Sequence, residues 1–234
     1  MNIIISTFVP EGIVLGTLAI SELQEKIEIQ EAIVFKEKII DNIRHSKLLF
    51  GKYGIVFYGE GFLNDQNFLI CLDEFELKYK SENLSFEHIP DLLLQYFSEI
   101  RFSVICYLAG YIVNKQIKFE QHVYLISLSE GTCERINTDK DSKQLYHYHI
   151  CGQNQLVARL LGNIKVQQGK EWIEITAPQI DCQMFSLEQS KIFILYILSN
   201  IINYSNLQNG NFNHSPQKEL VVINRTQSNY IEMI

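Results

Sequence analysis

The chain has 234 residues, of which 47% are apolar and 20% are charged, a balance typical of a folded globular protein rather than a disordered one. Its formal net charge of −7 argues against nucleic acid or an anionic membrane as the main partner, because both require a concentrated positive surface. No internal repeat and no linker rich in Pro, Gly or Ser divides the sequence. We therefore expect a single domain over residues 1–234.

The cysteines and the apolar segments indicate a soluble protein of the cytoplasm. The five cysteines are scattered and never spaced as CxxC, which favours reduced, interior thiols over disulfides or a zinc site. The N-terminal segment has no basic region, and its apolar run is broken at Ser6 and Thr7, so we expect no signal peptide. The apolar stretch Ile192–Ile202 is interrupted by Ser199 and Asn200 and is too short to span a bilayer. We expect no metal and no cofactor.

The start of the chain has the pattern of a β-hairpin. Two β-branched runs, Ile3–Ile5 and Ile13–Leu15, flank a predicted turn at residues 10–12. Residues 19–42 then mix charged and apolar positions. This segment could hold a strand and a helical stretch, with boundaries that the pattern does not fix.

A second hairpin and two helices are predicted next. The strands Lys47–Phe50 and Gly54–Tyr58 are separated by turn residues, which is a hairpin signal. Apolar residues recur at helical spacing over Phe62–Leu77. The polar residues 78–90 are predicted as a loop that ends at a proline, and Asp91–Phe102 has the pattern of an amphipathic helix.

The middle of the chain is predicted to return to strands. Ser103–Ile112 and Gln121–Ser127 are apolar strand candidates, with a turn at residues 130–131. The charged segment Asn137–Lys143 is predicted as a loop before a further strand, Gln144–Ile150.

The last third contains two predicted helices and two predicted strands. Gln153–Leu161 is a helix candidate that ends at Gly162. Ser186–Gln189 has the spacing of a capping box at the start of a long helix, about Leu187–Tyr204. The remaining segments are a polar loop over 206–217 and strands over Glu219–Ile223 and Asn229–Met233.

This order of elements favours an α/β chain of the α+β kind. Strands occur as antiparallel hairpins and helices occur in pairs, which argues against a doubly wound parallel sheet. We expect a four-layer αββα sandwich, with two antiparallel sheets between helix layers.

Several segments of the chain form a recognisable series, and they are Gly12–Leu15, Lys47–Phe50, Tyr58–Gly61, Asp65, Leu108–Tyr111, His122–Leu128, Glu130-Gly131, His149–Gly152 with the helix that follows, Ser186–Gln189 and Leu220–Ile223. In this order they resemble the segments of a proteasome-type subunit, which has the N-terminal-nucleophile hydrolase fold. They cover nearly the whole chain. The resemblance implies the sandwich fold and assembly of subunits into rings, and it points to a degenerate, bacterial proteasome-like protein.

The catalytic residues that the resemblance implies are mostly missing. In active members a threonine roughly ten residues before the first-turn glycine attacks the substrate, and its free α-amino group acts as base. Counting back from Gly12 reaches Asn2, which has no nucleophilic group. The expected acidic residue falls near Thr17 or Leu18, neither of which has a carboxylate, and Gln153 replaces a serine-type residue. Of the family's catalytic set, Lys47 alone has a counterpart.

We therefore expect an inactive proteasome-like subunit that acts through homo-oligomeric assembly. The segment Leu187–Tyr204 is apolar nearly all round, so part of it is left either for contact with another copy or for cover by the loop Asn206–Gln217. One alternative is an N-terminal-nucleophile threonine or serine peptidase, or an amidohydrolase, activated by cleavage before Ser6 or Thr7. The other alternative is a stand-alone binding protein on the same scaffold.

Three other patterns are better explained by structure than by ligand binding. His147 and His149 would share one face of a strand, but no third metal ligand is evident, and the neighbouring tyrosines favour an aromatic surface. Gly59-Glu60-Gly61 favours a tight turn over a phosphate loop, because no GxGxxG pattern or GKS/T follows. Asn137–Asp141 lacks the ligand spacing of a calcium loop and favours a solvated turn.

Overall fold

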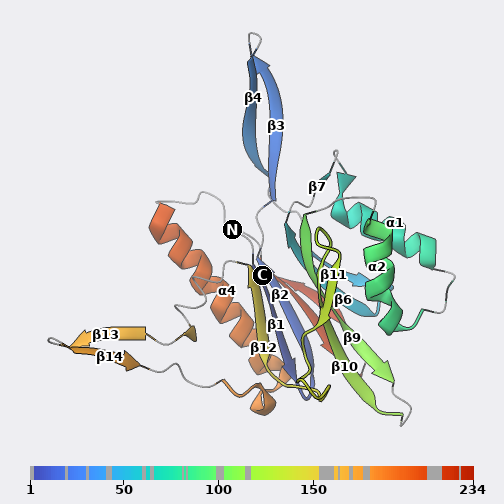
Figure 1. The fold of residues 1–234 in the computed structure, drawn as a ribbon, viewed down its shortest axis with the longest axis vertical. Coiled ribbons are helices and arrows are strands. Elements are labelled where there is room, and N and C mark those ends of the chain that lie inside the picture. Colours follow the sequence, from blue (N-terminus) through green and yellow to red (C-terminus); the bar gives the residue numbers. More distant parts are fainter. Residues whose placement is uncertain are drawn as a thin grey trace.

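Two five-stranded antiparallel sheets form the body of the protein in the computed structural model (Figure 1). The structure describes residues 3–18, 21–29, 32–40, 44–59, 62–63, 66–80, 82, 84–98, 103–113, 117–152, 161–162, 164–168, 171–175, 180–209, 218–226 and 228–234. In order across the first sheet, the strands are β12 (Tyr148–Gly152), β1 (Ile3–Val9), β2 (Gly12–Leu18), β15 (Lys218–Asn224) and β16 (Tyr230–Met233). Across the second sheet they are β11 (Thr132–Arg135), β10 (Phe119–Ser127), β9 (Val104–Val113), β6 (Tyr53–Gly59) and β5 (Ser46–Leu49). The chain therefore has an α+β fold.

The two sheets bury apolar side chains against each other. Ile4 and Phe8 of β1 lie in one core with Tyr107 and Ala109 of β9. Successive side chains of a strand point to opposite faces, so the odd-numbered residues of β1, such as Ile5, lie on the outer face of the first sheet. Every residue of β1 and β2 is buried, which explains why these strands read as continuous apolar runs rather than alternating ones.

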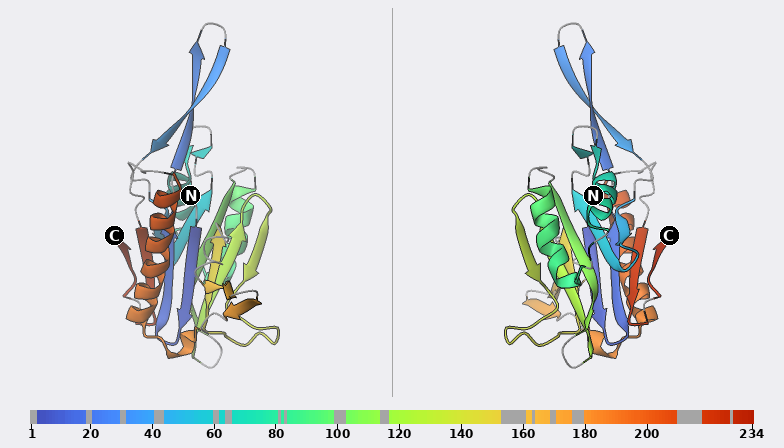
Figure 2. Two further views of the ribbon diagram at one scale, coloured as in Figure 1. Left: turned by 90° about the vertical axis from the view of Figure 1, so that its left-hand side faces the viewer. Right: turned by 90° about the vertical axis from the view of Figure 1, so that its right-hand side faces the viewer.

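Helices cover the outer face of each sheet, as the two side views show (Figure 2). The long helix α4 (Leu187–Asn209) buries Ile194, Ile197, Leu198 and Ile201 on the first sheet. Helices α1 (Phe68–Tyr79) and α2 (Ile89–Phe97) pack on the second sheet, with a short 3₁₀ turn, η1 (Phe86–His88), before α2. A second 3₁₀ turn, η2 (Cys182–Met184), precedes α4.

The start of α4 is fixed by the predicted capping box. The Ser186 Oγ accepts a hydrogen bond from the Gln189 backbone N–H at 3.1 Å, and the Gln189 Oε1 accepts one from the Ser186 N–H at 2.8 Å. Glu11, in the turn between β1 and β2, accepts a further bond from the Leu187 N–H at 2.8 Å. The turn of the first hairpin thus holds the N-terminus of the helix that covers its sheet.

Three further pairs of strands form small two-stranded sheets. They are β3 (Ser21–Ile29) with β4 (Ala32–Ile40), β7 (Phe62–Leu63) with β8 (Gln66–Asn67), and β13 (Ile164–Gln168) with β14 (Glu171–Ile175). The β3–β4 pair projects from the body in every view (Figures 1 and 2), and the β13–β14 pair projects to one side in Figure 1.

The structure confirms most predicted strands and corrects several boundaries. The first, second and closing strand pairs are present, each with slightly different ends. No helix occurs in the described part of 19–42, which forms the β3–β4 pair instead. The helix predicted from Phe62 begins at Phe68, because Asn67 caps it by accepting a bond from the Leu69 N–H at 2.8 Å.

Other differences lie in the loops. The predicted loop 78–90 contains the end of α1, η1 and the first two residues of α2. The strand predicted from Gln144 begins at Tyr148, and α4 continues to Asn209, into the segment predicted as a loop. The β13–β14 pair and β11 were not predicted. Of the predicted helix over Gln153–Leu161, residues 153–160 lie outside the described residues, as does Asp65.

The helix α4 leaves less apolar surface in water than its sequence predicts. Over Leu187–Tyr204, the large apolar side chains that stay mainly exposed are Ile192, at 60%, and Tyr196, at 57%. The others are buried in the core with the first sheet or partly buried at its border. Any assembly surface on this helix is therefore narrow.

Candidate functional site

The two candidate nucleophiles lie in the interior of a central strand. Ser6 and Thr7 are fully buried in β1, which pairs with β12 on one side and β2 on the other. The Ser6 Oγ donates to the His149 carbonyl oxygen at 3.3 Å. The Thr7 Oγ1 is buried without a hydrogen-bond partner among the described residues. A cut before either residue would remove part of β1, with which both β12 and β2 form backbone hydrogen bonds.

The lysine suggested by the family resemblance is held by two carboxylates of α1. The Lys47 Nζ forms ion pairs with Asp73 and, at 2.5 Å, with Glu76. The other oxygen of the Glu76 carboxylate accepts a hydrogen bond from the Phe50 N–H. Burial by itself lowers the pKa of the Lys47 ammonium, but the bonds to the two carboxylates outweigh that effect and leave the pKa raised.

The structure does not bring Lys47 together with Ser6 or Thr7. Lys47 points to α1, on the outer face of the second sheet, as does Leu49 two residues later. Ser6 lies on the same side of β1 as Ile4, which faces the second sheet, and Thr7 points toward α4. The second sheet itself therefore separates the lysine from both hydroxyls.

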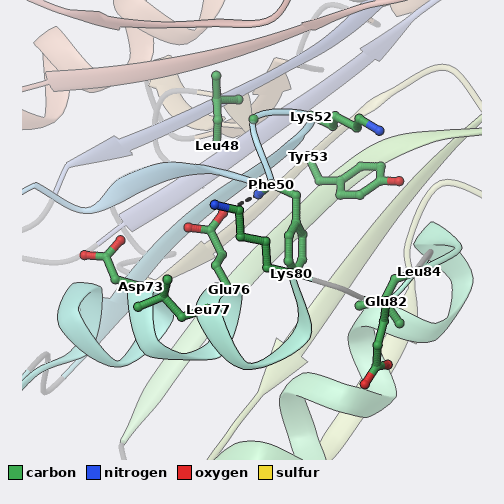
Figure 3. A pocket seen from close by; sticks show the side chains of 11 residues that line it. Leu48, Phe50, Lys52, Tyr53, Asp73, Glu76, Leu77, Lys80, Glu82 and Leu84 are labelled. Carbon is green, nitrogen blue, oxygen red and sulfur yellow. Dashed lines mark hydrogen bonds between the residues drawn. The ribbon is translucent and has the colours of Figure 1, made fainter.

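A pocket of about 650 Å³ lies beside this ion-pair cluster (Figure 3). It is lined by Leu48, Phe50, Gly51, Lys52, Tyr53, Asp73, Glu76, Leu77, Lys80, Glu82 and Leu84. The β5–β6 hairpin forms one wall and the last turns of α1 form another. Apolar and aromatic groups alternate with both signs of charge, which suits a ligand that carries both kinds of group. Among the described residues that line it, none is Ser, Thr, Cys or His.

The turn that borders the pocket has an unusual backbone. Phe50 has φ +53° and Gly51 has φ +65°, the left-handed conformation that a hairpin turn of this kind requires. Such a φ is uncommon for a bulky residue. The carboxylate of Glu76 holds the backbone of Phe50 in this conformation by accepting a hydrogen bond from the Phe50 N–H. The Phe50 ring also packs on Phe75, with ring centroids 6.0 Å apart.

A second polar cluster, which sequence reasoning missed, lies between the two sheets at β12. The Tyr107 Oη and the His149 Nδ1 are 2.6 Å apart, and the Tyr58 Oη and the Cys151 Sγ are 3.2 Å apart. Burial raises the pKa of both tyrosines and lowers that of His149, so these groups are neutral near pH 7. The alternation of polar residues in 147–151 is the sequence pattern that could have predicted this cluster. The partners of these residues on β6 and β9, however, depend on how the two sheets pack.

The other predicted candidates have internal partners. The His147 ring packs edge-on against Phe8, 4.9 Å between centroids, in agreement with the predicted aromatic surface. The Asp139 Oδ1 accepts from the Asp141 and Lys143 N–H groups at 2.9 and 2.8 Å, which closes a turn. Gly59 has φ +123° at the end of β6, as expected for a tight turn, whereas residues 60 and 61 lie outside the described part of the chain.

Comparison with known proteins gives no match: no known protein family and no curated protein matches this sequence. Within the described ranges, no three His, Cys, Asp or Glu side chains are grouped so that they could hold a metal ion. Over the same residues, no helix has both the length and the apolar character needed to cross a membrane.

The geometry of Lys47 predicts a structural role that can be measured. Lys47→Met should lower the free energy of unfolding by roughly 1–3 kcal/mol, because it removes two charge-assisted hydrogen bonds at a side chain only 16% exposed. The raised pKa adds stability that is present below the unfolded lysine value and is lost as the pH rises through the folded value. The variant should therefore lose less stability than the wild type in strong alkali.

Urea unfolding at neutral and alkaline pH measures both effects. Lys52→Met is the matched control, since Lys52 lines the same pocket but lies exposed in the turn, and it should change stability by less than about 0.5 kcal/mol. Equal stability of Lys47→Met and wild type would show that the ion pairs contribute nothing.

Proposed function

We propose that this chain is a catalytically inactive, proteasome-like subunit that acts through assembly of several copies. Under this proposal, residues 1–234 form one four-layer αββα sandwich of the N-terminal-nucleophile hydrolase type. Three separate apolar cores support it: one between the sheets, one under α4, and one under α1 and α2. We place the protein in the cytoplasm, in keeping with its five free cysteines.

The position of the candidate nucleophiles is the observation that carries the inactive assignment. An N-terminal nucleophile must present its hydroxyl and its free amino group at an accessible chain end. Ser6 and Thr7 instead lie fully buried in the middle of β1. Lys47, the one retained catalytic counterpart, is bound to Asp73 and Glu76 on the far side of the second sheet.

The pocket favours a second candidate, a stand-alone binding protein on the same scaffold. Its volume of about 650 Å³ is within the range of small-molecule sites, roughly 300–1,000 Å³. Peptide segments and small zwitterions have the mixture of apolar and charged groups that its walls offer. A binding protein of this kind requires no assembly, so the oligomeric state distinguishes it from the assembling subunit.

Intact mass, active-site labelling and light scattering together test the proposal. We expect no cleavage before Ser6 or Thr7, no adduct with a peptidyl epoxyketone, and a particle whose mass is a multiple of 27.2 kDa. An adduct on a chain that starts at Ser6 or Thr7 would replace the proposal with the peptidase or amidohydrolase alternative. An unlabelled monomer at micromolar concentration would favour the binding protein.

A further inference from the structure

An apolar surface lines much of the pocket between the β5–β6 hairpin and α1 (Figure 3). Two aromatic residues and three leucines form it, namely Leu48, Phe50, Tyr53, Leu77 and Leu84. The Tyr53 ring is held in place by Phe86, with ring centroids 4.7 Å apart. Leu77 is 70% exposed, so part of this wall faces water. An apolar or aromatic group bound here would remove that surface from water, which is favourable.

Two of the carboxylates at the pocket already have partners within the protein. Asp73 and Glu76 both form ion pairs with Lys47. Glu76 also accepts a hydrogen bond from the Phe50 N–H. The carboxylate of Glu82 is exposed and points away from the hairpin in Figure 3. A cationic ligand would therefore have to compete with Lys47 for the carboxylates of α1.

The two lysines that line the pocket have no such partners. Neither the Lys52 nor the Lys80 ammonium forms an ion pair or a side-chain hydrogen bond with any residue in the described ranges. Lys80 is the C-cap residue of α1, where its charge offsets the partial negative charge of the helix end. Lys52 lies in the exposed turn of the hairpin, and the Asn229 Nδ2 fixes that turn by donating to the Lys52 carbonyl oxygen at 2.6 Å. Lys52 is therefore the cation that is most available to a ligand.

The Tyr53 hydroxyl adds a hydrogen-bond donor beside Lys52. Figure 3 shows the Tyr53 hydroxyl and the Lys52 ammonium pointing the same way, away from Asp73 and Glu76. Burial raises the pKa of the Tyr53 hydroxyl, so this group stays protonated at neutral pH and can donate a hydrogen bond. An ammonium and a hydroxyl donor next to an apolar surface suit an anion that is attached to an apolar body.

We propose that the pocket binds an organic carboxylate with an aromatic or aliphatic body. The carboxylate binds at Lys52 and Tyr53. The body covers Phe50 and Leu77. These lining residues all belong to one chain, so binding requires no second copy. The inference rests on the second candidate function, the binding protein, and it names the class of ligand that this protein takes.

Three probes with one body and three head groups test the preference for an anion. Cinnamate is anionic at neutral pH, cinnamyl alcohol is neutral, and cinnamylamine is cationic. The dissociation constant, measured by calorimetry or by ligand-observed NMR titration, should be about tenfold lower for cinnamate than for cinnamylamine, with the alcohol between them. An alcohol or amine that binds as tightly as cinnamate, or no binding of any probe at millimolar concentration, would overturn the inference.

Two substitutions test where the carboxylate binds. Lys52→Glu reverses the charge of an exposed side chain and should weaken cinnamate binding at least about fivefold. Tyr53→Phe keeps the ring and removes the donor, and it should weaken cinnamate more than cinnamyl alcohol. Lys140→Glu is the matched control, since Lys140 is exposed and does not line the pocket, and it should leave the dissociation constant unchanged.

A second pair of variants tests where the body binds. Leu77→Ser removes exposed apolar surface from the pocket and should weaken all three probes, because they share one body. Ile70→Ser is the matched control, since Ile70 is 52% exposed on the same helix and does not line the pocket. Circular dichroism and thermal unfolding should be the same for both variants and wild type, because both side chains lie at the surface.

Binding and assembly are measured separately, so the failure of one is distinguishable from the failure of the other. Cinnamate binding that Lys52→Glu and Leu77→Ser leave unchanged would place the ligand elsewhere, and it would overturn the inference while leaving assembly standing. A monomer that binds cinnamate through this pocket would overturn assembly and support the binding protein. Preference for cinnamate, lost in Lys52→Glu and retained in Lys140→Glu, is the result that we expect.

Discussion

Glu219→Ala should lower the free energy of unfolding by about 2–5 kcal/mol. Glu219 lies at the start of β15 and is only 1% exposed. Its carboxylate accepts hydrogen bonds from the His45 N–H, at 2.9 Å, and from the Ser46 hydroxyl. Alanine would leave both buried donors unsatisfied at a place where the first sheet meets β5 of the second sheet. Chemical unfolding at neutral pH measures this loss.

Glu219→Gln is the matched control for the charge. The amide keeps the shape and one acceptor oxygen, and the Ser46 hydroxyl can rotate to accept from the new N–H₂ group. We expect the glutamine variant to lose about 1 kcal/mol, well under the alanine variant. Equal losses in the two variants would mean that the donors are not satisfied by this side chain.

The same pair of variants predicts a pH dependence. Burial raises the pKa of the Glu219 carboxyl above its ordinary value, and the bonds from Ser46 and His45 and the charge of Arg44 offset part of that effect. A raised pKa in the folded state adds stability below the unfolded value, and this contribution is lost as the pH rises through the folded value. Wild type should therefore be most stable, relative to Glu219→Gln, at acidic pH, and this advantage should shrink toward neutral pH.

A neighbouring histidine does not obscure this comparison. Burial lowers the pKa of His45 to about 4, so this group contributes stability at neutral pH that is lost as the pH falls from the unfolded value toward 4. His45 is present in both proteins, and its contribution cancels in the difference between them. An advantage of wild type over glutamine that grows toward neutral pH would contradict the raised pKa of Glu219.

The parts of the fold that sequence predicts well are those with local chemistry. The capping box at Ser186 and Gln189 forms as its spacing predicts, because both hydrogen bonds lie within one turn of helix. The first hairpin is recognised from its turn residues and β-branched strands. The start of α1 is also predictable from the sequence, because Asn67 is a favoured capping residue and directly precedes the first turn of the helix.

Other elements depend on contacts that the sequence does not display. Residues 21–29 and 32–40 mix charged and apolar positions in a way that fits neither the helical nor the strand period alone, and their ribbon form is set by the pairing of β3 with β4. Lys47 drew attention through the family resemblance, but its position on the outer face of the second sheet follows from the packing of α1 on β5. The Ser46–Glu219 bond joins residues 173 positions apart. No pattern within either segment points to the other.

Gly59→Ala should cost at least about 3 kcal/mol of the free energy of unfolding, the second large effect that we expect. Gly59 has φ +123°, a conformation that residues with a side chain rarely adopt. A Cβ atom there would also overlap the carbonyl oxygen of Ser103, on the chain that leads into β9. The overlap involves backbone on both sides, so no side-chain rotation can relieve it.

Gly51→Ala is the matched control, because it shares the positive φ and lacks the overlap. Gly51 has φ +65°, and a Cβ atom there would meet nothing within 4 Å. Its cost should be limited to the left-handed backbone, about 1–2 kcal/mol. Thermal or urea unfolding should show a larger loss of the free energy of unfolding for Gly59→Ala than for Gly51→Ala. Gly59 is also the last residue of β6, next to Tyr58, which contacts Cys151. Equal losses would mean that β6 and the start of β9 can move apart, and that Gly59 is needed for its backbone angle alone.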